Sequence, residues 1–310
     1  MAVSPASVAR PAPVTGRPLP IRRFLDREGV FSWLMLAPGV LFLAAFVAYP
    51  FFYGIYLSLS ERRVAQPGTF VGLANFVTMT HDAVFWQVTR NTFVYTVVAT
   101  LLKMVGGLAM ALVINQQFRG RNVARAFLLL PFIVPTVLST VAWMWILDPT
   151  FSVVNWTLVN SGLTTQRFSW LGNADLAMAS IIAVNTWRGL PFYGITLLAG
   201  LQTISPDLYE AAAIDGAGVV QRFRFITLPV LKPILVIVTM FSVIFTFSDF
   251  QLPYVLTHGG PANATHLFAT YAFDIGMSAG VLGMGAAVAL AMLPALALLI
   301  VGLTLYLRRE

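Results

Sequence analysis

Six long apolar stretches constrain this chain more than any other feature of its sequence. A helix needs roughly 20 mostly apolar residues to cross the hydrocarbon core of a bilayer. The stretches that meet this requirement cover approximately residues 32–58, 91–115, 126–147, 177–200, 231–255 and 281–307. We therefore expect an all-α integral membrane protein with six transmembrane helices.

Composition and charge narrow the possible classes further. The chain is 58% hydrophobic and only 10% charged, whereas a soluble domain carries about 25% charged residues. It has no cysteine, which excludes disulfides, thiolate metal sites and a cysteine nucleophile. The net charge is +7, but the basic residues are scattered between apolar runs, so nucleic-acid binding is not expected.

The placement of the basic residues predicts the orientation. Six spans put both termini on one side, and most of the 19 lysines and arginines fall on that side. Loops rich in lysine and arginine stay in the cytoplasm, so both termini are expected there. The residues on this side are Arg10, Arg17, Arg22, Arg23, Arg27, Arg119, Arg121, Arg125, Arg222, Arg224, Lys232, Arg308 and Arg309.

The first 30 residues differ from the rest of the chain. They contain five arginines, and five prolines fall within the first 20 positions. Such a segment buries too little apolar surface to order itself, and no short apolar stretch with a cleavage site follows the arginines. We expect a disordered cytoplasmic tail at 1–30, with a partner-docking arm as the alternative, and a membrane domain at 31–310.

The cytoplasmic loop at about 202–230 contains two helical segments too short to span a membrane. Ser205 is a favourable N-cap and Pro206 suits the first helical position, so a helix should begin there. It should end at Gly216, because glycine accepts a left-handed backbone at little cost. A second helical run from about Val219 to Ile226 leads into the fifth span. The sequence therefore predicts a helix-turn-helix on the cytoplasmic face.

This loop also carries a spaced motif. Glu-Ala-Ala is followed after three residues by Gly, and after nine more by Ile-x-Leu-Pro, at Glu210, Ala211, Ala212, Gly216, Ile226, Leu228 and Pro229. The motif resembles the coupling loop of permease subunits of type I ATP-binding-cassette importers. The alternative is a surface hairpin that merely connects two spans, and the match at every motif position favours the family.

The resemblance implies a mechanism and a set of partners. In this family the short helix sits in a cleft of an ATPase subunit, so that ATP-driven closure moves the membrane helices. It implies two ATP-binding subunits, a second homologous permease (a heterodimer rather than a homodimer), a soluble substrate-binding protein and a multi-pass location in the bacterial inner membrane. The chain itself is then a transport subunit without enzymatic activity or cofactor, because ATP and Mg bind to the partner ATPase.

Three further segments point to a branch of the family. FVGLANF at Phe70–Phe76, RGLPF at Arg188–Phe192 and LTHGGPANATHLF at Leu256–Phe268 resemble carbohydrate-importer permeases of the maltose type. With them the resemblance covers about residues 31–308. Where the family usually has three glycines before the proline, this chain has His258 followed by two glycines, which weakens inference of the substrate from that loop. A sugar or polyol is expected, with glycerol phosphate or a polyamine as alternatives.

Polar residues within the predicted spans are candidates for the substrate pathway, because charges in spans are costly and face cavities or partners. Arg188 and Trp187 lie in the fourth span, and Asp249 and Gln251 lie near the outer end of the fifth. Asn91, at the outer end of the second span, is a candidate that helix capping explains equally well. A structural contact between helices is the alternative for Arg188. For Lys103, in the second span, snorkelling or pairing with another helix is expected.

Other readings of the sequence are less consistent with it. GMSAG at Gly276–Gly280 matches the G-x-S-x-G pattern of hydrolases but lies in an outer loop, without the strand that such an elbow needs. No P-loop motif is present, and the three histidines fit no usual zinc spacing. A secondary transporter driven by an ion gradient remains an alternative, although it leaves the cytoplasmic motif unexplained.

Overall fold

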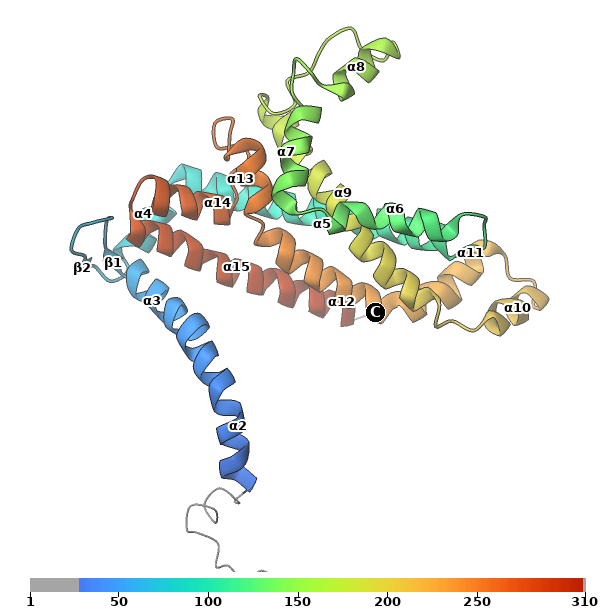
Figure 1. Cartoon of the computed structure of the whole chain (residues 1–310), viewed down its shortest axis with the longest axis horizontal. Coiled ribbons are helices and arrows are strands. Elements are labelled where there is room, and N and C mark those ends of the chain that lie inside the picture. Colours follow the sequence, from blue (N-terminus) through green and yellow to red (C-terminus); the bar gives the residue numbers. More distant parts are fainter. Residues whose placement is uncertain (1–27, 309–310) are drawn as a thin grey trace, which may run out of the picture. The chain divides into compact units, whose positions relative to one another are not determined.

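The computed structural model describes residues 28–308 (Figure 1). The predicted tail therefore lies almost entirely outside the described residues. The chain divides into two compact units, one ending at Tyr53 and the other beginning at Gly54. Each unit is described by itself.

The first unit consists of a long apolar helix. It comprises α2 (Glu28–Leu43), the π-helical turn η1 (Ala44–Ala48) and the beginning of α3 (Tyr49–Ser58). Its large side chains are exposed on every face, Trp33 and Phe46 among them. A helix that is apolar all round requires lipid or a protein partner as its surroundings.

The second unit contains short elements and long packed helices. The end of α3 is followed by the antiparallel pair β1 (Ser60–Glu61) and β2 (Thr69–Phe70), with Ser60 opposite Phe70. The helices that follow are α4 (Ala74–Thr80), α5 (Ala83–Asn115), α6 (Arg121–Ile133), α7 (Thr136–Ile146), α8 (Val153–Asn160), α9 (Ala174–Leu201), α10 (Pro206–Ile214), α11 (Val219–Arg222), η2 (Phe223–Thr227), α12 (Leu228–Phe247), α13 (Gln251–Thr257), α14 (Phe268–Phe273), η3 (Asp274–Ser278) and α15 (Leu282–Arg308).

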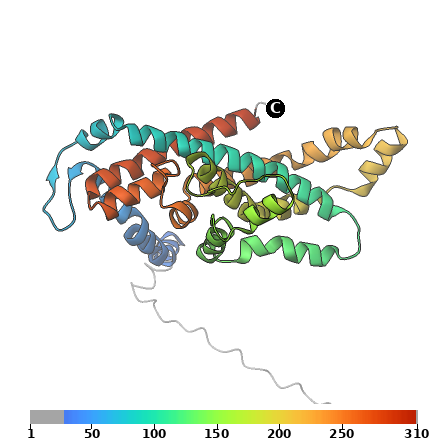
Figure 2. The ribbon, with the colours of Figure 1, turned by 90° about the horizontal axis from the view of Figure 1, so that it is seen from above.

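The centre of this unit is the contact between α5 and α9, against both of which α12 packs. Figure 2 shows α5 running along most of the unit. Glycines allow the close approach: a Cβ at Gly107 would overlap Tyr193 Cβ, and one at Gly194 would lie 2.5 Å from Met110 Sδ. Small residues at such contacts let membrane helices pack closely, which stabilises them where the hydrophobic effect contributes little.

The described residues contain four helices that are long and apolar enough to cross a membrane, at Ser32–Ser58, Ala83–Asn115, Val219–Phe247 and Leu282–Gly302. The bent pair α6–α7 makes a fifth if it is counted as one span. The fourth predicted span coincides with α9, which has 28 residues. Its middle is less apolar because Asn185, Trp187 and Arg188 interrupt the apolar run.

Two predicted boundaries were wrong, and one predicted span is bent. In the stretch 126–147, α6 and α7 meet at an angle of 96°. The break falls at Val134, whose backbone is extended, as expected for a residue that precedes a proline. The second span begins at Ala83 rather than at residue 91. Asp82 caps this helix by accepting a hydrogen bond from Val84 N. The fifth ends at Phe247, and α13 follows after a three-residue break.

Candidate functional site

The short helix predicted in the loop at about 202–230 is α10, and both of its ends are confirmed. Ser205 Oγ accepts a hydrogen bond from Asp207 N at 3.3 Å, and Pro206 occupies the first turn. After the helix, Gly216 adopts a φ of +81°, and Ala217 N donates to Ala212 O at 2.8 Å. This is the left-handed C-terminal turn that glycine makes with the least strain.

The second helical run is continuous with the membrane helix that follows it. Residues Val219–Phe247 form one 29-residue helix, made of α11, η2 and α12. Ile226, Leu228 and Pro229 of the motif lie within it. Tyr209 of α10 and Thr227 of η2 are joined by a hydrogen bond of 2.8 Å between their hydroxyl oxygens. The loop is thus tied to the start of a long helix at two places, through the chain and through this bond.

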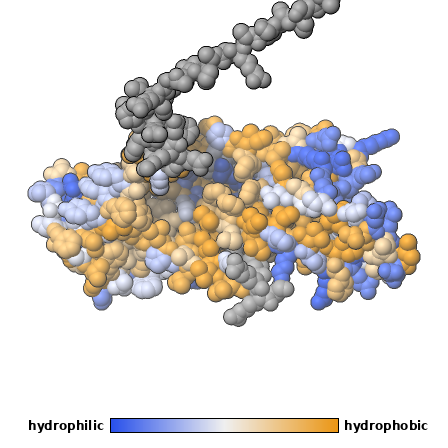
Figure 3. Space-filling view, turned by 90° about the horizontal axis from the view of Figure 1, so that it is seen from below, coloured by the Kyte–Doolittle hydropathy of each residue, from blue (hydrophilic) through white to orange (hydrophobic). Residues whose placement is uncertain are grey.

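The solvent-exposed surface of the loop contains both charged and apolar groups. Glu210 and Ala211 are exposed and Ala212 is half-buried, and Ile214, Val219 and Val220 are more than 70% exposed. Figure 1 shows α10 and α11 projecting at one end of the unit, where hydrophilic side chains gather in Figure 3. Exposed apolar side chains rimmed by charges are typical of protein-interaction surfaces.

A cavity of about 470 Å³ lies where α12 ends. It brings together three of the predicted pathway residues, namely Arg188, Asp249 and Gln251. The complete lining consists of Lys103, Phe132, Asn185, Arg188, Gly189, Phe192, Ser242, Phe245, Thr246, Ser248, Asp249, Phe250 and Gln251. Cavities with apolar walls and a few convergent polar groups are the usual form of small-molecule sites.

A hydrogen-bond network on one wall of the cavity surrounds Asp249. Its Oδ2 accepts from Tyr95 Oη at 2.7 Å and from Asn185 Nδ2 at 3.0 Å. The other carboxylate oxygen, Oδ1, accepts from Leu252 N at 3.4 Å. Lys103 Nζ donates to Asn185 Oδ1 at 2.8 Å and to Thr246 Oγ1 at 2.7 Å. Most of the hydrogen-bonding capacity of Asp249 is therefore used within the protein.

Arg188 differs from Asp249 in having donor capacity left. Its Nε is buried and has no hydrogen-bond partner among the described residues, and the side chain lines the cavity. Buried polar groups are almost always satisfied in native structures, so an unpaired one is a candidate for binding a ligand. Gln251 and Ser248 are exposed at the same wall. Four phenylalanines, Phe132, Phe192, Phe245 and Phe250, supply the apolar part.

Two predicted pathway residues do not line this cavity. Trp187 packs edge-to-face against Trp143, with ring centroids 5.4 Å apart. Asn91 lies inside α5, and its amide donates to Asn263 O at 3.0 Å and His266 O at 3.3 Å. Helix capping by Asn91, the alternative explanation, is wrong because Asp82 caps α5. Asn91 instead holds the loop between α13 and α14.

The sequence interpretation missed the role of Asn185 and of the phenylalanines. Asn185 lies one turn before Arg188 on α9, so it faces the same side of the helix. That spacing was a usable signal for Asn185. The phenylalanines gave no signal, since aromatic residues are common throughout apolar spans. Within the described residues, no group of three or more histidine, aspartate or glutamate side chains could hold a metal ion.

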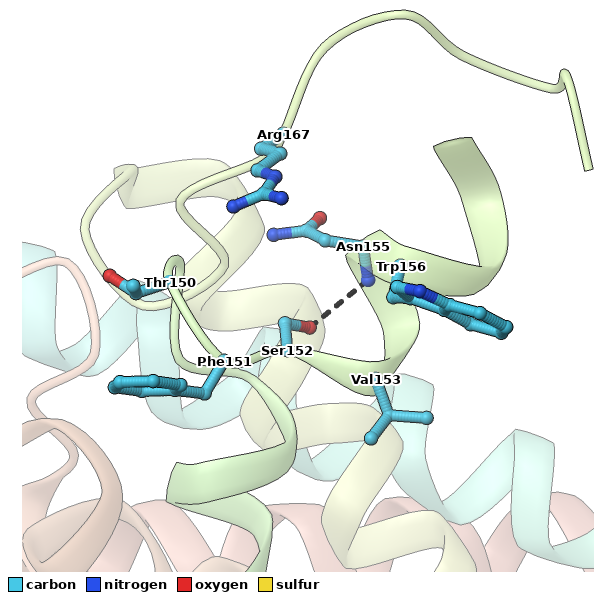
Figure 4. A pocket seen from close by; sticks show the side chains of 7 residues that line it. All are labelled: Thr150, Phe151, Ser152, Val153, Asn155, Trp156 and Arg167. Carbon is cyan, nitrogen blue, oxygen red and sulfur yellow. Dashed lines mark hydrogen bonds between the residues drawn. The ribbon is translucent and has the colours of Figure 1, made fainter. Parts of the chain in front are cut away.

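A second, smaller pocket of about 280 Å³ lies beside α8, lined by Thr150, Phe151, Ser152, Val153, Asn155, Trp156 and Arg167. Figure 4 shows Arg167 above the Asn155 side chain, with Phe151 and Trp156 pointing away from each other. Asn155 Nδ2 donates to Phe168 O, and its Oδ1 accepts from Phe168 N and Trp170 Nε1. The polar centre of this pocket therefore holds together the segment between α7 and α9.

Comparison with known proteins gives a consistent result. Residues 103–309 match the family described as binding-protein-dependent transport system inner membrane component. The chain is 36% identical to the trehalose/maltose transport system permease protein MalF of Thermococcus litoralis, over 85% of this chain and 89% of that protein. It is 34% identical to the sulfoquinovosyl glycerol transport system permease protein SmoG of Agrobacterium fabrum, over 87% and 88%.

The fold also matches a solved structure. A chain of a bacterial ABC transporter involved in the import of the acidic polysaccharide alginate superimposes with a TM-score of 0.79. The match covers 93% of this chain and 98% of that one, at 22% sequence identity. A second structure of a bacterial alginate transporter, in complex with an alginate pentasaccharide-bound periplasmic protein, gives 0.75. At this identity the likeness establishes the fold alone.

Proposed function

The chain belongs to the family of inner membrane components of binding-protein-dependent transport systems, and from that premise we propose that it passes a sugar or related polyol through the cavity at the end of α12, driven by ATP hydrolysis on a partner. A member of this family is a transport subunit of an ABC importer, located in the inner membrane, and not an enzyme.

One observation carries the mechanism. The helix Val219–Phe247 begins in the cytoplasmic loop and ends at the cavity wall. A displacement of α10 and α11 by an ATPase subunit moves this helix, because the loop has no flexible linker on its C-terminal side. Glu210, Ala211, Ala212 and Gly216 then form the contact with the ATPase, while Ile226, Leu228 and Pro229 belong to the lever.

The substrate class rests on the cavity and on the relatives. Arg188, Gln251 and Ser248 present hydrogen-bonding groups beside phenylalanine rings, a combination that suits a polyhydroxylated ring. The relatives named above are permeases of transport systems for trehalose/maltose and for sulfoquinovosyl glycerol. A non-sugar solute such as glycerol phosphate or a polyamine is the alternative within the same mechanism.

The proposed topology has six spans with both termini in the cytoplasm. The four apolar helices, the bent pair α6–α7 and α9 supply the six segments. Arg119 lies in the α5–α6 connection and Arg121 begins α6, while Arg222 ends α11 and Arg224 lies in η2, both after α10. The excess of arginine in these two connections supports a cytoplasmic location for both.

The proposed assembly contains a second permease subunit, most simply a homologue, two ATP-binding subunits and a soluble substrate-binding protein. The family description supports the binding protein, and the exposed apolar side chains on α10 and α11 support an ATPase contact at the loop. No cofactor is assigned to this chain, since ATP and Mg bind to the ATPase.

Uptake by the purified complex in proteoliposomes tests this proposal. The assay uses labelled trehalose, maltose, a polyol, glycerol phosphate and spermidine, with the co-purified binding protein outside and ATP inside. We expect uptake of a sugar or polyol that requires both ATP and the binding protein. Uptake by this chain alone under an ion gradient would show instead a secondary transporter, and uptake of only spermidine or glycerol phosphate would contradict the substrate class.

A further inference from the structure

We propose that Lys103 is a positioning residue of the transport pathway: it clamps α5 to α9 and α12 and supplies the counter-charge that holds Asp249 at the cavity wall. This inference rests on the proposed function. It starts from the burial of Lys103, which is only 4% exposed although it lies in the middle of a membrane helix. A lysine in such a place needs partners, because an unpaired buried charge is very costly.

The partners of Lys103 connect three helices. Its ammonium group on α5 donates to Asn185 on α9 and to Thr246 on α12. Both acceptors are neutral, and the negative charge that acts on Lys103 is the carboxylate of Asp249. Asn185 lies between the two charges, accepting from Lys103 and donating to Asp249 Oδ2.

The network includes a second residue of α5. Tyr95, on the same face of α5 as Lys103, donates to the same Oδ2 of Asp249. Eight residues separate the two α5 side chains, which corresponds to about 12 Å along a helix. Asp249 is therefore bonded to α5 through Tyr95, and Asn185 is bonded to α5 through Lys103. Neither side chain can move away from α5 without breaking its hydrogen bond.

Asp249 is placed at the interruption of the fifth membrane helix. It lies in the three-residue break between α12 and α13, and its Oδ1 accepts from Leu252 N in the first turn of α13. All three residues of this break, Ser248, Asp249 and Phe250, line the cavity. A change in the network thus changes the shape of the cavity at its polar wall.

The packing leaves space for the lysine side chain. A Cβ at Gly189 would overlap Lys103 Cδ, so an added methyl group forces the lysine stem to move. Gly189 itself lines the cavity. A residue larger than glycine at this position therefore displaces the stem of Lys103 without removing its charge. Such a variant tests whether the position of the ammonium group matters, whereas Lys103→Met tests whether the group is needed at all.

The experiment compares Lys103→Met, Asp249→Asn, the double variant and Gly189→Ala with the wild-type complex. The measured quantity is solute imported per ATP hydrolysed in proteoliposomes, after the amount of assembled complex has been determined. We expect Lys103→Met and Gly189→Ala to lower this ratio at least fivefold. We expect the double variant to return to within twofold of Asp249→Asn alone, because removing both members of the Lys103–Asp249 pair leaves neither charge without the other.

The control is Thr89→Ala on the same helix, whose hydroxyl group donates to Phe85 O of its own helix. A purely structural role for Lys103 lowers assembly, ATPase activity and uptake together and leaves the ratio unchanged, which contradicts the proposal. A ratio in Lys103→Met within twofold of the wild type also contradicts it, as does a double variant no better than Lys103→Met.

If Lys103→Met does not assemble, assembly becomes the measured quantity. The clamp then predicts that Asp249→Asn restores assembly in the double variant, and the absence of restoration overturns it. A wild-type complex that imports none of the sugars contradicts the proposed substrate class only, since the assembly of these variants still tests the clamp.

Discussion

Tyr209 and Thr227 are joined by a 2.8 Å hydrogen bond that ties the short helix α10 to the base of the long helix ending at the cavity. Their hydroxyl groups lie 18 residues apart in the sequence and close the loop into a hairpin. Through this bond, force applied to α10 reaches the membrane helix directly, in addition to passing along the backbone.

Removing this bond is expected to weaken coupling without unfolding the protein. A neutral hydrogen bond contributes about 1 kcal/mol, which corresponds to roughly a fivefold change in an equilibrium. Tyr209→Phe should therefore lower the solute imported per ATP hydrolysed a few-fold. Thr203→Val is a matched control, because Thr203, in the turn after α9, donates its Oγ1 hydrogen bond locally to Gly200 O. Equal ratios in Tyr209→Phe and the wild type would show that the bond plays no part in coupling.

Glu210→Lys and Gly216→Asp are expected to abolish transport while the chain remains in the membrane. Glu210 is exposed on α10, so its carboxylate is accessible to an arginine of the ATPase. Breaking such a pair from one side costs on the order of 2–5 kcal/mol. Binding-protein-dependent uptake and immunoblotting of membranes measure the two effects, and normal uptake by either variant contradicts the coupling role.

Gly216 has an internal control two residues away. An L-residue in the left-handed conformation of Gly216 (φ +81°) costs about 1–2 kcal/mol. Gly218 has a φ of −70°, which any residue adopts. Gly216→Ala should therefore reduce ATP-dependent uptake, whereas Gly218→Ala should leave it within twofold of the wild type. The same loss in both variants would indicate sensitivity to added volume rather than to backbone conformation.

Arg188→Ala and Asp249→Ala are expected to change the apparent affinity for the transported solute, because both side chains line the cavity. Arg188 should have the larger effect on solute binding, since its buried Nε has no partner within the described part of the chain. Trp187 and Asn91 lie outside the cavity, so Trp187→Ala and Asn91→Ala should leave the affinity for the solute unchanged. Unchanged affinity in both cavity variants, with intact ATPase assembly, removes them from the substrate site.

The burial of His266, in the loop between α13 and α14, predicts a dependence of stability on pH. Burial lowers the pKa of His266, and the charge of Asp274 opposes this effect. The unfolded chain therefore binds more protons here than the folded one, so stability present above about pH 6.5 is lost as the pH falls through the folded pKa. Thermal unfolding of the purified complex between about pH 5 and 8 should show this loss, and His266→Gln should reduce it. An identical pH profile in the variant contradicts the assignment.

The cytoplasmic loop was predictable because its determinants are local. Ser205, Pro206 and Gly216 act on backbone groups within a few residues of themselves, and the structure places the helix where they indicate. The bend between α6 and α7 follows from Pro135 by an equally local rule.

The cavity depends on contacts that sequence spacing does not show. Lys103 bonds to groups 82 and 143 residues away, and the partners of Asn91 lie 172 and 175 residues away. The break at Ser248–Phe250 contains no glycine or proline, but Pro253 follows it in the first turn of α13. Because proline lacks an N–H and its ring clashes with the carbonyl four residues earlier, it disfavours a continuous helix through Asp249. The position of Asp249 at the cavity wall depends in addition on its hydrogen-bond network, which exists only after α5, α9 and α12 have packed together.

The central claim is that the cytoplasmic loop moves the cavity wall through the helix Val219–Phe247. Because the chain contains no cysteine, a single cysteine in Ser248→Cys reports specifically on the cavity wall, where this position is exposed. The measurement is the rate at which a small thiol reagent modifies it in the assembled complex, with and without ATP. The account predicts a rate that changes with ATP and no longer changes when Glu210→Lys is added. A rate that is the same with and without ATP, in a complex that transports its solute, would contradict it.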